Sequence, residues 1–337
     1  MGGKEDGCFY GYHAGMMPDS NSNEGLRPQF VQLLWVDPLQ HPRGQAHLSA
    51  ASGLVHLHGR FYVVADDELH LGAFDDNAVP GATPVHGALL RMLDGSLPND
   101  KRERKQTKPD LEALVLLPAL PGCPAGALLA LGSGSLPNRE IGVVVALDVH
   151  GVPNGRMATL NMAALYAPLR KRFADLNIEG ALVVSGELLL LQRGNKGDAR
   201  NACIRYDWNQ IAPWLAGLSA QPPQPKSVQV LQLGSVGSVP LGLTDGIALH
   251  GGEWMFCAVA EDTGNSVQDG ACLGSVIGIV GIDGEVRYMV SLAGAPKVEG
   301  ISAQADGDSW AVTLVTDPDD PAQASQMLRV RLPMLPA

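Results

Sequence analysis

Hydrophobic residues in this chain form short runs separated by turn residues, a pattern typical of strands and not of helices. The clearest example is the stretch 246–292. Its apolar runs cover residues 246–250, 253–260, 274–282 and 286–292. An Asp283-Gly284 pair between the last two runs is a hairpin signal. The pattern predicts a four-stranded antiparallel sheet whose inner strands are covered on both faces.

The beginning of this unit recurs along the chain. Each copy has a small or acidic residue, usually followed by Gly or Ala, and then an apolar pair. The copies begin at Ser52, Glu112, Glu179, Asp245 and Glu299. Their spacings of 60, 67, 66 and 54 residues predict propeller blades that carry insertions.

The last unit supplies only three runs, at 301–305, 310–315 and 327–332. The run 30–36 precedes the first unit and has no other partner. Pairing it with the last unit closes the ring and removes two exposed sheet edges.

We therefore predict an all-β fold, a five-bladed β-propeller closed by its N-terminal strand. Residues 28–337 form a single domain, and residues 1–27 form a disordered tail. A doubly wound α/β fold is disfavoured, because it needs long crossovers between strands and most connections here are too short. Apolar residues at helical spacing within 166–176 and 207–225 predict two short surface helices, the second a flap over a blade edge.

Charge and composition narrow the function classes. The chain has 35 acidic and 24 basic residues, a net charge of −11, which argues against nucleic acid and anionic membrane partners. The first 27 residues lack the apolar stretch of a signal peptide. Five cysteines without a CxxC spacing argue against a disulfide framework or a zinc knuckle. We expect a cytoplasmic monomer that binds a small anionic substrate or ligand.

Propeller topology places the candidate chemistry around one end of the central channel. Within a blade, the first strand starts and the second strand ends at the same face, near the axis. The first-strand starts are Ser52, Glu112, Glu179, Asp245 and Glu299. Side chains at the second-strand ends include Asp66, Asp67, Arg193, Glu261 and Asp262.

Four carboxylates in a narrow channel repel one another. At a separation of roughly 7 Å and an effective dielectric of about 20, each pair costs about 2 kcal/mol. The carboxyls can be protonated, Arg193 and water can neutralise them, or a cation can lie on the axis. Several hard oxygen ligands in a loose geometry favour Ca²⁺ over Zn²⁺ or Mg²⁺. The alternative is a purely structural ring, in which the acidic side chains accept hydrogen bonds from nearby backbone amides.

Residues 52–67, with the sequence SGLVHLHGRFYVVADD, resemble the opening blade of the calcium-activated nucleotidases (apyrases). That family is a five-bladed propeller in which each blade supplies one Ser or Glu side chain around a central Ca²⁺. The resemblance implies that Ser52, Glu112, Glu179 and Glu299 bind calcium, whereas Asp245 stands where Ser is expected. The chain also resembles bacterial propellers described as phytase-like or esterase-like.

Two functional hypotheses remain. In the first, the chain is a metal-dependent hydrolase of phosphoester or phosphoanhydride bonds. The cation polarises or positions the substrate, Arg193 holds its anionic group, and an acid activates water. The candidate acids are Asp66, Asp67, Glu261 and Asp262. In the second, the chain is a non-enzymatic propeller whose channel mouth binds a small molecule or a protein, with a structural cation or none.

Overall fold

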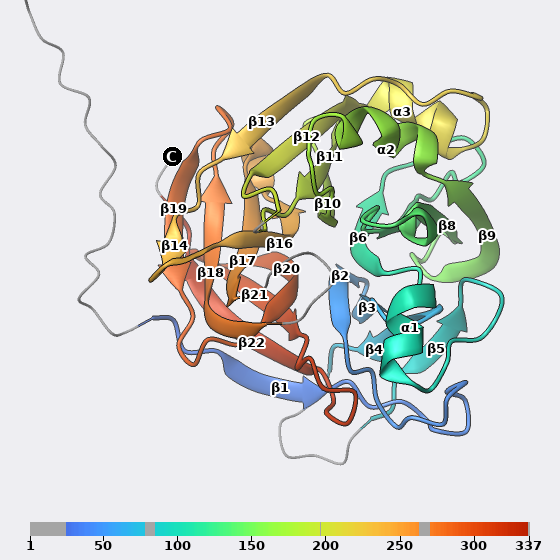
Figure 1. The fold of residues 1–337 in the computed structure, drawn as a ribbon, viewed down its shortest axis with the longest axis horizontal. Helices are drawn as coiled ribbons and strands as arrows, with labels where there is room; N and C mark the ends of the chain where they lie inside the picture. The colour runs from blue at the N-terminus through green and yellow to red at the C-terminus, as the bar shows by residue number, and fades with distance from the viewer. Residues whose placement is uncertain (1–24, 78–84, 196, 263–269, 336–337) are drawn as a thin grey trace, which may run out of the picture.

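A computed structural model describes residues 25–77, 85–195, 197–262 and 270–335. Five four-stranded antiparallel sheets surround a common centre (Figure 1). Blade 1 contains β2 (Ala51–Leu57), β3 (Arg60–Ala65), β4 (His70–Asp75) and β5 (Ala88–Arg91). Blade 2 contains β6 (Leu111–Leu117), β7 (Ala127–Gly132), β8 (Ile141–Leu147) and β9 (Pro153–Asn161). Blade 3 contains β10 (Ile178–Val184), β11 (Glu187–Gln192), β12 (Asn201–Asp207) and β13 (Ser227–Leu231).

The last two blades complete the ring. Blade 4 contains β16 (Gly242–Ala248), β17 (Trp254–Asp262), β18 (Ala271–Val280) and β19 (Val286–Ser291). Blade 5 contains β20 (Val298–Asp306), β21 (Ser309–Thr316), β22 (Gln326–Pro333) and, from the other end of the chain, β1 (Gln29–Leu33). The minor elements are the hairpin of β14 (Ser235–Val236) and β15 (Val239–Pro240), and the 3-10 turns η1 (Pro137–Arg139) and η2 (His250–Gly252).

The ring closes as the sequence predicts. Strand β1 pairs antiparallel with β22 as the outermost strand of blade 5. The closure also extends to blade 4, because Leu26 forms a parallel bridge with Leu292, just after β19. Residues 25–27, which the sequence analysis assigns to the tail, therefore belong to the propeller. The remainder of the predicted tail, residues 1–24, lies outside the described residues.

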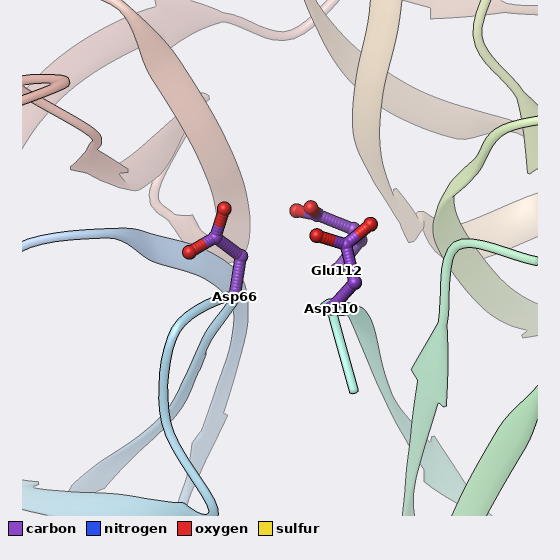
Figure 2. A group of neighbouring side chains, drawn as sticks. All are labelled: Asp66, Asp110 and Glu112. Carbon is purple, nitrogen blue, oxygen red and sulfur yellow. The ribbon is translucent and has the colours of Figure 1, made fainter. Parts of the chain in front are cut away.

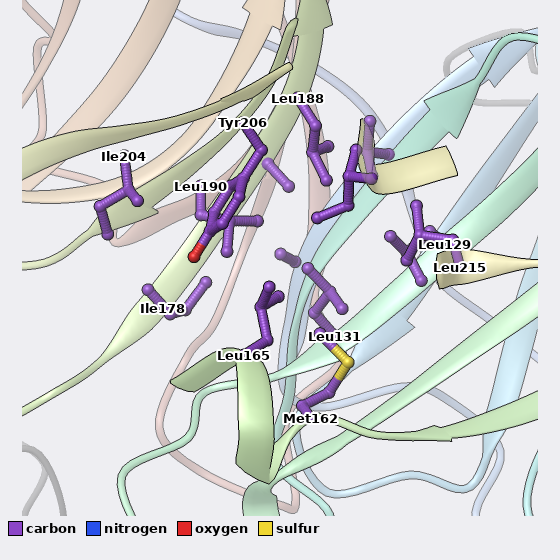
Figure 3. Packing of buried hydrophobic residues seen from close by; sticks show 14 of the residues in the cluster. Leu129, Leu131, Met162, Leu165, Ile178, Leu188, Leu190, Ile204, Tyr206 and Leu215 are labelled. Carbon is purple, nitrogen blue, oxygen red and sulfur yellow. The ribbon is translucent and has the colours of Figure 1, made fainter. Parts of the chain in front are cut away.

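Buried hydrophobic side chains fill the seams between blades. Strand β7 is buried at all of its positions, as expected for a strand covered on both faces. Between blades 2 and 3, Leu131 and Leu190 belong to one large apolar cluster, called here the seam cluster (Figure 3). Each fully buried leucine in such a cluster contributes roughly 1.5–3 kcal/mol to stability.

Two helices cover the seam cluster. Helix α2 (Ala163–Arg170) contributes Leu165 and Tyr166, and α3 (Trp208–Leu215) contributes Ile211 and Trp214. The sequence predicts both helices, but α2 begins before the predicted segment 166–176 and ends well short of its end, and both helices bury side chains in the seam cluster; the aromatic residues of α3 serve packing, as predicted. A third helix, α1 (Lys101–Thr107), lies beside blade 1. No helix within the described ranges is long and apolar enough to cross a membrane.

The five innermost strands, β2, β6, β10, β16 and β20, contact one another in that circular order. They enclose the central channel, and all of them run in the same direction along it. The ends at which they begin define the face that we call the channel mouth.

Candidate functional site

A β-bulge marks the same position near the start of every innermost strand. In β6, the pairing with β7 moves from Leu111 to Ala113 without a partner for Glu112. The corresponding extra residues are Ser52 in β2, Glu112 in β6, Glu179 in β10, Thr244 in β16 and Glu299 in β20. A bulge turns its extra residue out of the regular ladder and re-aims the side chain. We call these five positions the ring.

The structure corrects the position of Asp245. The pairing of β16 with β17 shifts between Leu243 and Asp245, so Thr244 is the ring residue of blade 4. Thr244 corresponds to Glu299, and Asp245 corresponds to Gly300. The Asp245-Gly246 pair of blade 4 looks like the Glu-Gly pairs of blades 3 and 5 in sequence. In the structure it lies one residue further along its strand than those pairs do. The ring therefore has three carboxylates and two hydroxyl groups.

Asp245 lies one layer further along the channel, where it joins three strands. Its carboxylate accepts hydrogen bonds from the amides of Gly246 (2.8 Å) and Ile301 (3.0 Å), and from the amide of Leu54. Burial raises the pKa of Asp245 well above its usual range, against the effect of these three amides. A methyl group on Gly180 would lie 2.8 Å from the Asp245 Cα, so this layer is tightly packed. Asp245 therefore has a structural role: it accepts hydrogen bonds from backbone amides, which is the alternative to cation binding given above.

Arg193 is the principal counter-ion of the ring. It follows β11, is 9% exposed, and lies against Gly242, where a Cβ would be 3.0 Å from its Cγ and Nε. Its guanidinium nitrogens lie 3.2 Å from Glu179 Oε2, 2.6 Å from Glu261 Oε2 and 3.6 Å from Glu299 Oε2. The prediction that Arg193 points into the acidic mouth is confirmed.

Lys297 is a second counter-ion, which the sequence analysis missed. Its Nζ lies 3.7 Å from Glu299 Oε1, 3.6 Å from Glu261 Oε1, 3.4 Å from Asp317 Oδ2 and 2.5 Å from Asp319 Oδ1. Burial raises the pKa of Glu299 to about 8, although Arg193 and Lys297 oppose this shift. The charge of the ring is therefore partly balanced by the protein itself.

On the side of blades 1 and 2, the ring residue Glu112 belongs to a second acidic group. Carboxylate oxygens of Asp66, Asp110 and Glu112 lie within 4.8 Å of one another, with Asp66 approaching from the opposite side to the other two (Figure 2). The Lys108 ammonium pairs with Asp66 and lies 2.9 Å from Asp110 Oδ1, and Arg139 lies 2.7 Å from Asp110 Oδ2. Here a lysine already stands between two of the three carboxylates.

Burial is the main cause of the pKa shifts on this side of the mouth. It raises the pKa of Asp66 to about 7, and it raises the pKa of Glu112 well above its usual range, with the nearby Glu179 adding to the effect. Asp110 is the exception. Lys108 and Arg139 hold its pKa below the usual value despite its burial.

Not all of the predicted catalytic residues reach the ring. Asp66, Arg193 and Glu261 do, through the contacts above. The Asp67 carboxylate is instead held by Arg43 (3.2 Å) and Arg104 (3.1 Å), where it links α1 to the segment before β2. Asp262 is exposed at the end of β17.

The missed residues share a sequence signal. Asp110, Asn177 and Lys297 each stand two positions before a ring residue, and all three contact the ring or its counter-ions. Asn177, for example, donates a hydrogen bond to Glu179 Oε1 at 2.5 Å. A polar residue at this spacing, repeated in three blades, was the available clue.

Comparisons with known proteins place the chain in a family. The sequence profile of DUF6929, described as a family of unknown function, matches residues 47–332. The chain belongs to DUF6929. The matched region includes every ring position of this DUF6929 chain. No curated protein matches it.

Solved structures similar to the DUF6929 chain include several enzymes. A luciferin-regenerating enzyme is 12% identical over 92% of this chain and 93% of its own, with a TM-score of 0.41. A GH130 structure, from work on hydrolases that target β-1,2 mannosidic linkages in Candida mannan, is 11% identical over 94% and 96%, with a TM-score of 0.45. An aldose sugar dehydrogenase from Streptomyces coelicolor, in its PQQ-bound form, is 12% identical over 90% and 98%, with a TM-score of 0.39. At these scores the similarities assign no substrate or reaction to the DUF6929 chain.

Proposed function

We propose that the ring binds a divalent cation, with Ca²⁺ the best fit, and that the mouth uses this cation to hydrolyse a phosphoester or phosphoanhydride. The donor set supports calcium, because Glu112, Glu179, Glu299 and Ser52 offer only hard oxygen ligands from four separate strands. The Ser52 and Thr244 hydroxyls donate hydrogen bonds to the Ala50 and Val298 carbonyls, at 3.2 and 2.9 Å, which leaves the lone pairs of both oxygens for a cation.

The observation that carries the proposal is a shortage of hydrogen-bond donors at the ring. Glu299 is 5% exposed, and its Oε2 atom is buried without a hydrogen-bond partner. The Glu112 carboxylate lies within 4.8 Å of the carboxylate oxygens of Asp66 and Asp110, and the nearby Glu179 adds to the rise in its pKa. A buried acceptor left without a donor costs about 1–3 kcal/mol, and more if it is charged. A cation on the axis would compensate both carboxylates at once.

The surrounding residues supply the other parts of a hydrolase. A bound cation would polarise a phosphoryl oxygen and stabilise the charge that develops on it. Asp66, close to Glu112 at the end of β3, is placed to take a proton from an attacking water molecule. Arg193 and Lys297 offer the positive charges that would hold the remaining phosphoryl oxygens.

A second candidate is a propeller that binds such an anion without turnover. It is favoured by the ion pairs that already engage the candidate acids: Asp67 with Arg104, Glu261 with Arg193, and Asp66 with Lys108. A general base has to exchange its proton freely, and each of these pairs opposes that.

Calcium titration of the metal-depleted protein tests the first step. We expect saturable one-to-one binding by calorimetry, and a melting temperature that rises with Ca²⁺ and falls with EDTA. Glu299→Gln should weaken binding at least tenfold, whereas Glu285→Gln, an exposed change in blade 4, should leave it unchanged. An absence of binding in the wild-type protein would refute the cation site.

Hydrolysis assays then separate the two candidates. Nucleotides, phytate, pyrophosphate and p-nitrophenyl phosphate should be tested with Ca²⁺ present, in the wild-type protein and in Asp66→Asn. Turnover that depends on both Ca²⁺ and Asp66 supports the hydrolase. Binding of these compounds without turnover in either protein establishes the second candidate.

A further inference from the structure

The counter-ions of the ring are shared between two layers of the mouth. Arg193 and Lys297 both approach the ring residue Glu299, at 3.6 and 3.7 Å. These separations exceed the usual hydrogen-bond range of about 2.7–3.2 Å, so both contacts are purely electrostatic. Both cations also reach Glu261, which is not a ring residue, and there Arg193 makes a closer contact of 2.6 Å.

The net charge of the mouth opposes binding of an anion alone. Counted in their ionised forms, the charged side chains of the mouth include four more acidic than basic residues, although burial opposes the ionisation of Glu112 and Glu299. The acidic residues are Asp66, Asp110, Glu112, Glu179, Glu261, Glu299, Asp317 and Asp319, and the basic residues are Lys108, Arg139, Arg193 and Lys297. A phosphate-type dianion would meet this negative field, and Arg193 is already engaged by three carboxylates.

A divalent cation on the ring would change both conditions. It would favour the ionised forms of the ring carboxyls and offset two of their negative charges, and it would compete with Arg193 for Glu179 and Glu299. With its attraction to these carboxylates reduced, the Arg193 guanidinium becomes available to an anion while still anchored near Glu261.

We propose that Arg193 couples the two sites, so that the axial cation and a phosphate-type anion bind cooperatively. This inference rests on the proposed function, because it requires a cation on the ring. The coupling is reciprocal by thermodynamic linkage: each ligand increases the affinity for the other by the same factor.

Arg193 is expected to weaken calcium binding when no anion is present and to strengthen it when an anion is bound. A purely structural role would not produce these opposite effects. Without an anion present, its positive charge opposes calcium. Arg193→Met should therefore tighten calcium binding by at least tenfold, the effect of charges about 6 Å apart in a water-like dielectric, since the buried channel has a lower dielectric. With an anion present, the same change should abolish the cooperativity. A merely destabilising substitution would weaken calcium binding in both situations.

The experiment is calorimetry of Ca²⁺ binding with and without phenylphosphonate, a phosphate analogue that cannot be hydrolysed. In the wild-type protein, saturating phenylphosphonate should lower the Kd for Ca²⁺ at least fivefold. In Arg193→Met, the Kd should be lower than in the wild type without phenylphosphonate, and it should not respond to it. Arg331→Met removes the same charge from an exposed position on blade 5, where Arg331 pairs with Asp306, and should behave as the wild type.

The outcomes distinguish this inference from the proposed function. If Ca²⁺ does not bind the wild-type protein, both fail. If Ca²⁺ binds but phenylphosphonate leaves its Kd unchanged, or if Arg193→Met weakens Ca²⁺ binding, only the coupling is overturned. Should Arg193→Met not fold, Arg193→Gln, which keeps a polar group at this position but removes the charge, tests the same prediction.

Discussion

The seam cluster and the channel mouth are both buried, but they are filled by opposite kinds of side chain. In the seam cluster, Leu131 and Leu190 pack against apolar neighbours from adjacent blades. In the mouth, Arg193 and Glu299 are buried almost as deeply, yet their interactions are charged. The seam cluster stabilises the packing of one blade on the next, whereas the buried charges of the mouth lower the stability of the fold unless they are compensated. This difference is the reason why we propose a function for the mouth, because buried charge is costly unless it is paired or binds a ligand.

The largest effect is expected in the seam. Leu190→Ala should lower the free energy of unfolding by about 2–5 kcal/mol, because it removes a fully buried side chain and leaves a cavity. Urea denaturation measures this change. Leu218→Ala, at a residue that is 71% exposed, is the control and should change the free energy by less than about 0.5 kcal/mol. The calcium affinity of Leu190→Ala should equal that of the wild type. A weaker affinity would show that the two regions are not independent.

A smaller loss is expected at the layer next to the mouth. Asp245→Asn keeps the shape of the side chain, but its amide nitrogen cannot accept a hydrogen bond from Leu54, Gly246 or Ile301. Losing such an acceptor from a buried site costs about 1–3 kcal/mol. Thermal or urea unfolding measures it, with the exposed Asp306→Asn as control. An unchanged stability would contradict the strand-joining role assigned to Asp245.

A pH-dependent effect is expected from His70, which is buried in blade 1. Burial lowers the pKa of His70 to about 4, with Arg91, His41 and Arg43 acting in the same direction. Glu68 also faces it, at 4.0 Å from Nδ1. The unfolded chain binds a proton at a pKa near 6.5 and the folded protein does not, so this contribution is complete above pH 6.5 and is lost as the pH falls toward 4.

The matched variant for this prediction is His70→Gln, which cannot be protonated. Its free energy of unfolding should fall less steeply than that of the wild type between pH 6.5 and 4, by roughly 1–3 kcal/mol across the interval. Parallel curves for the two proteins would rule out His70 as the source of acid sensitivity.

The sequence predicts the blades because their signal is local and repeated. Each blade buries its strands in the same way, so the same apolar runs and hairpin turns recur along the chain. The start of the innermost strand recurs with them, at Ser52, Glu112, Glu179 and Glu299. The closing strand β1 was also predictable, because the last unit has only three apolar runs and the run 30–36 before the first unit has no other partner. The nucleotidase resemblance and the calcium site remain predictions.

The remaining errors arise where cross-strand pairing decides the outcome. Thr244 could not be distinguished from Asp245 by residue type, because the bulge is defined by which residue lacks a partner on β17. Asp67 was grouped with Asp66 because the two are adjacent. In the turn after β3, however, one carboxylate pairs with Lys108 and the other with Arg104. Lys297 lies only two positions before Glu299, but its contacts with Glu261 and with Asp317 and Asp319, which follow β21, depend on the folding of separate blades.

The packed layer around Asp245 forms a rigid floor beneath the ring. Its carboxylate is bound by β2 and β20 as well as by its own strand, and the glycines beside it leave no space for even a methyl group. The innermost strands are therefore held in close contact directly below the ring, so a group bound on the ring would rest on a layer that cannot easily widen. A cation bound as proposed would have this rigid layer on one side and the side chains of Arg193 and Lys297 on the other.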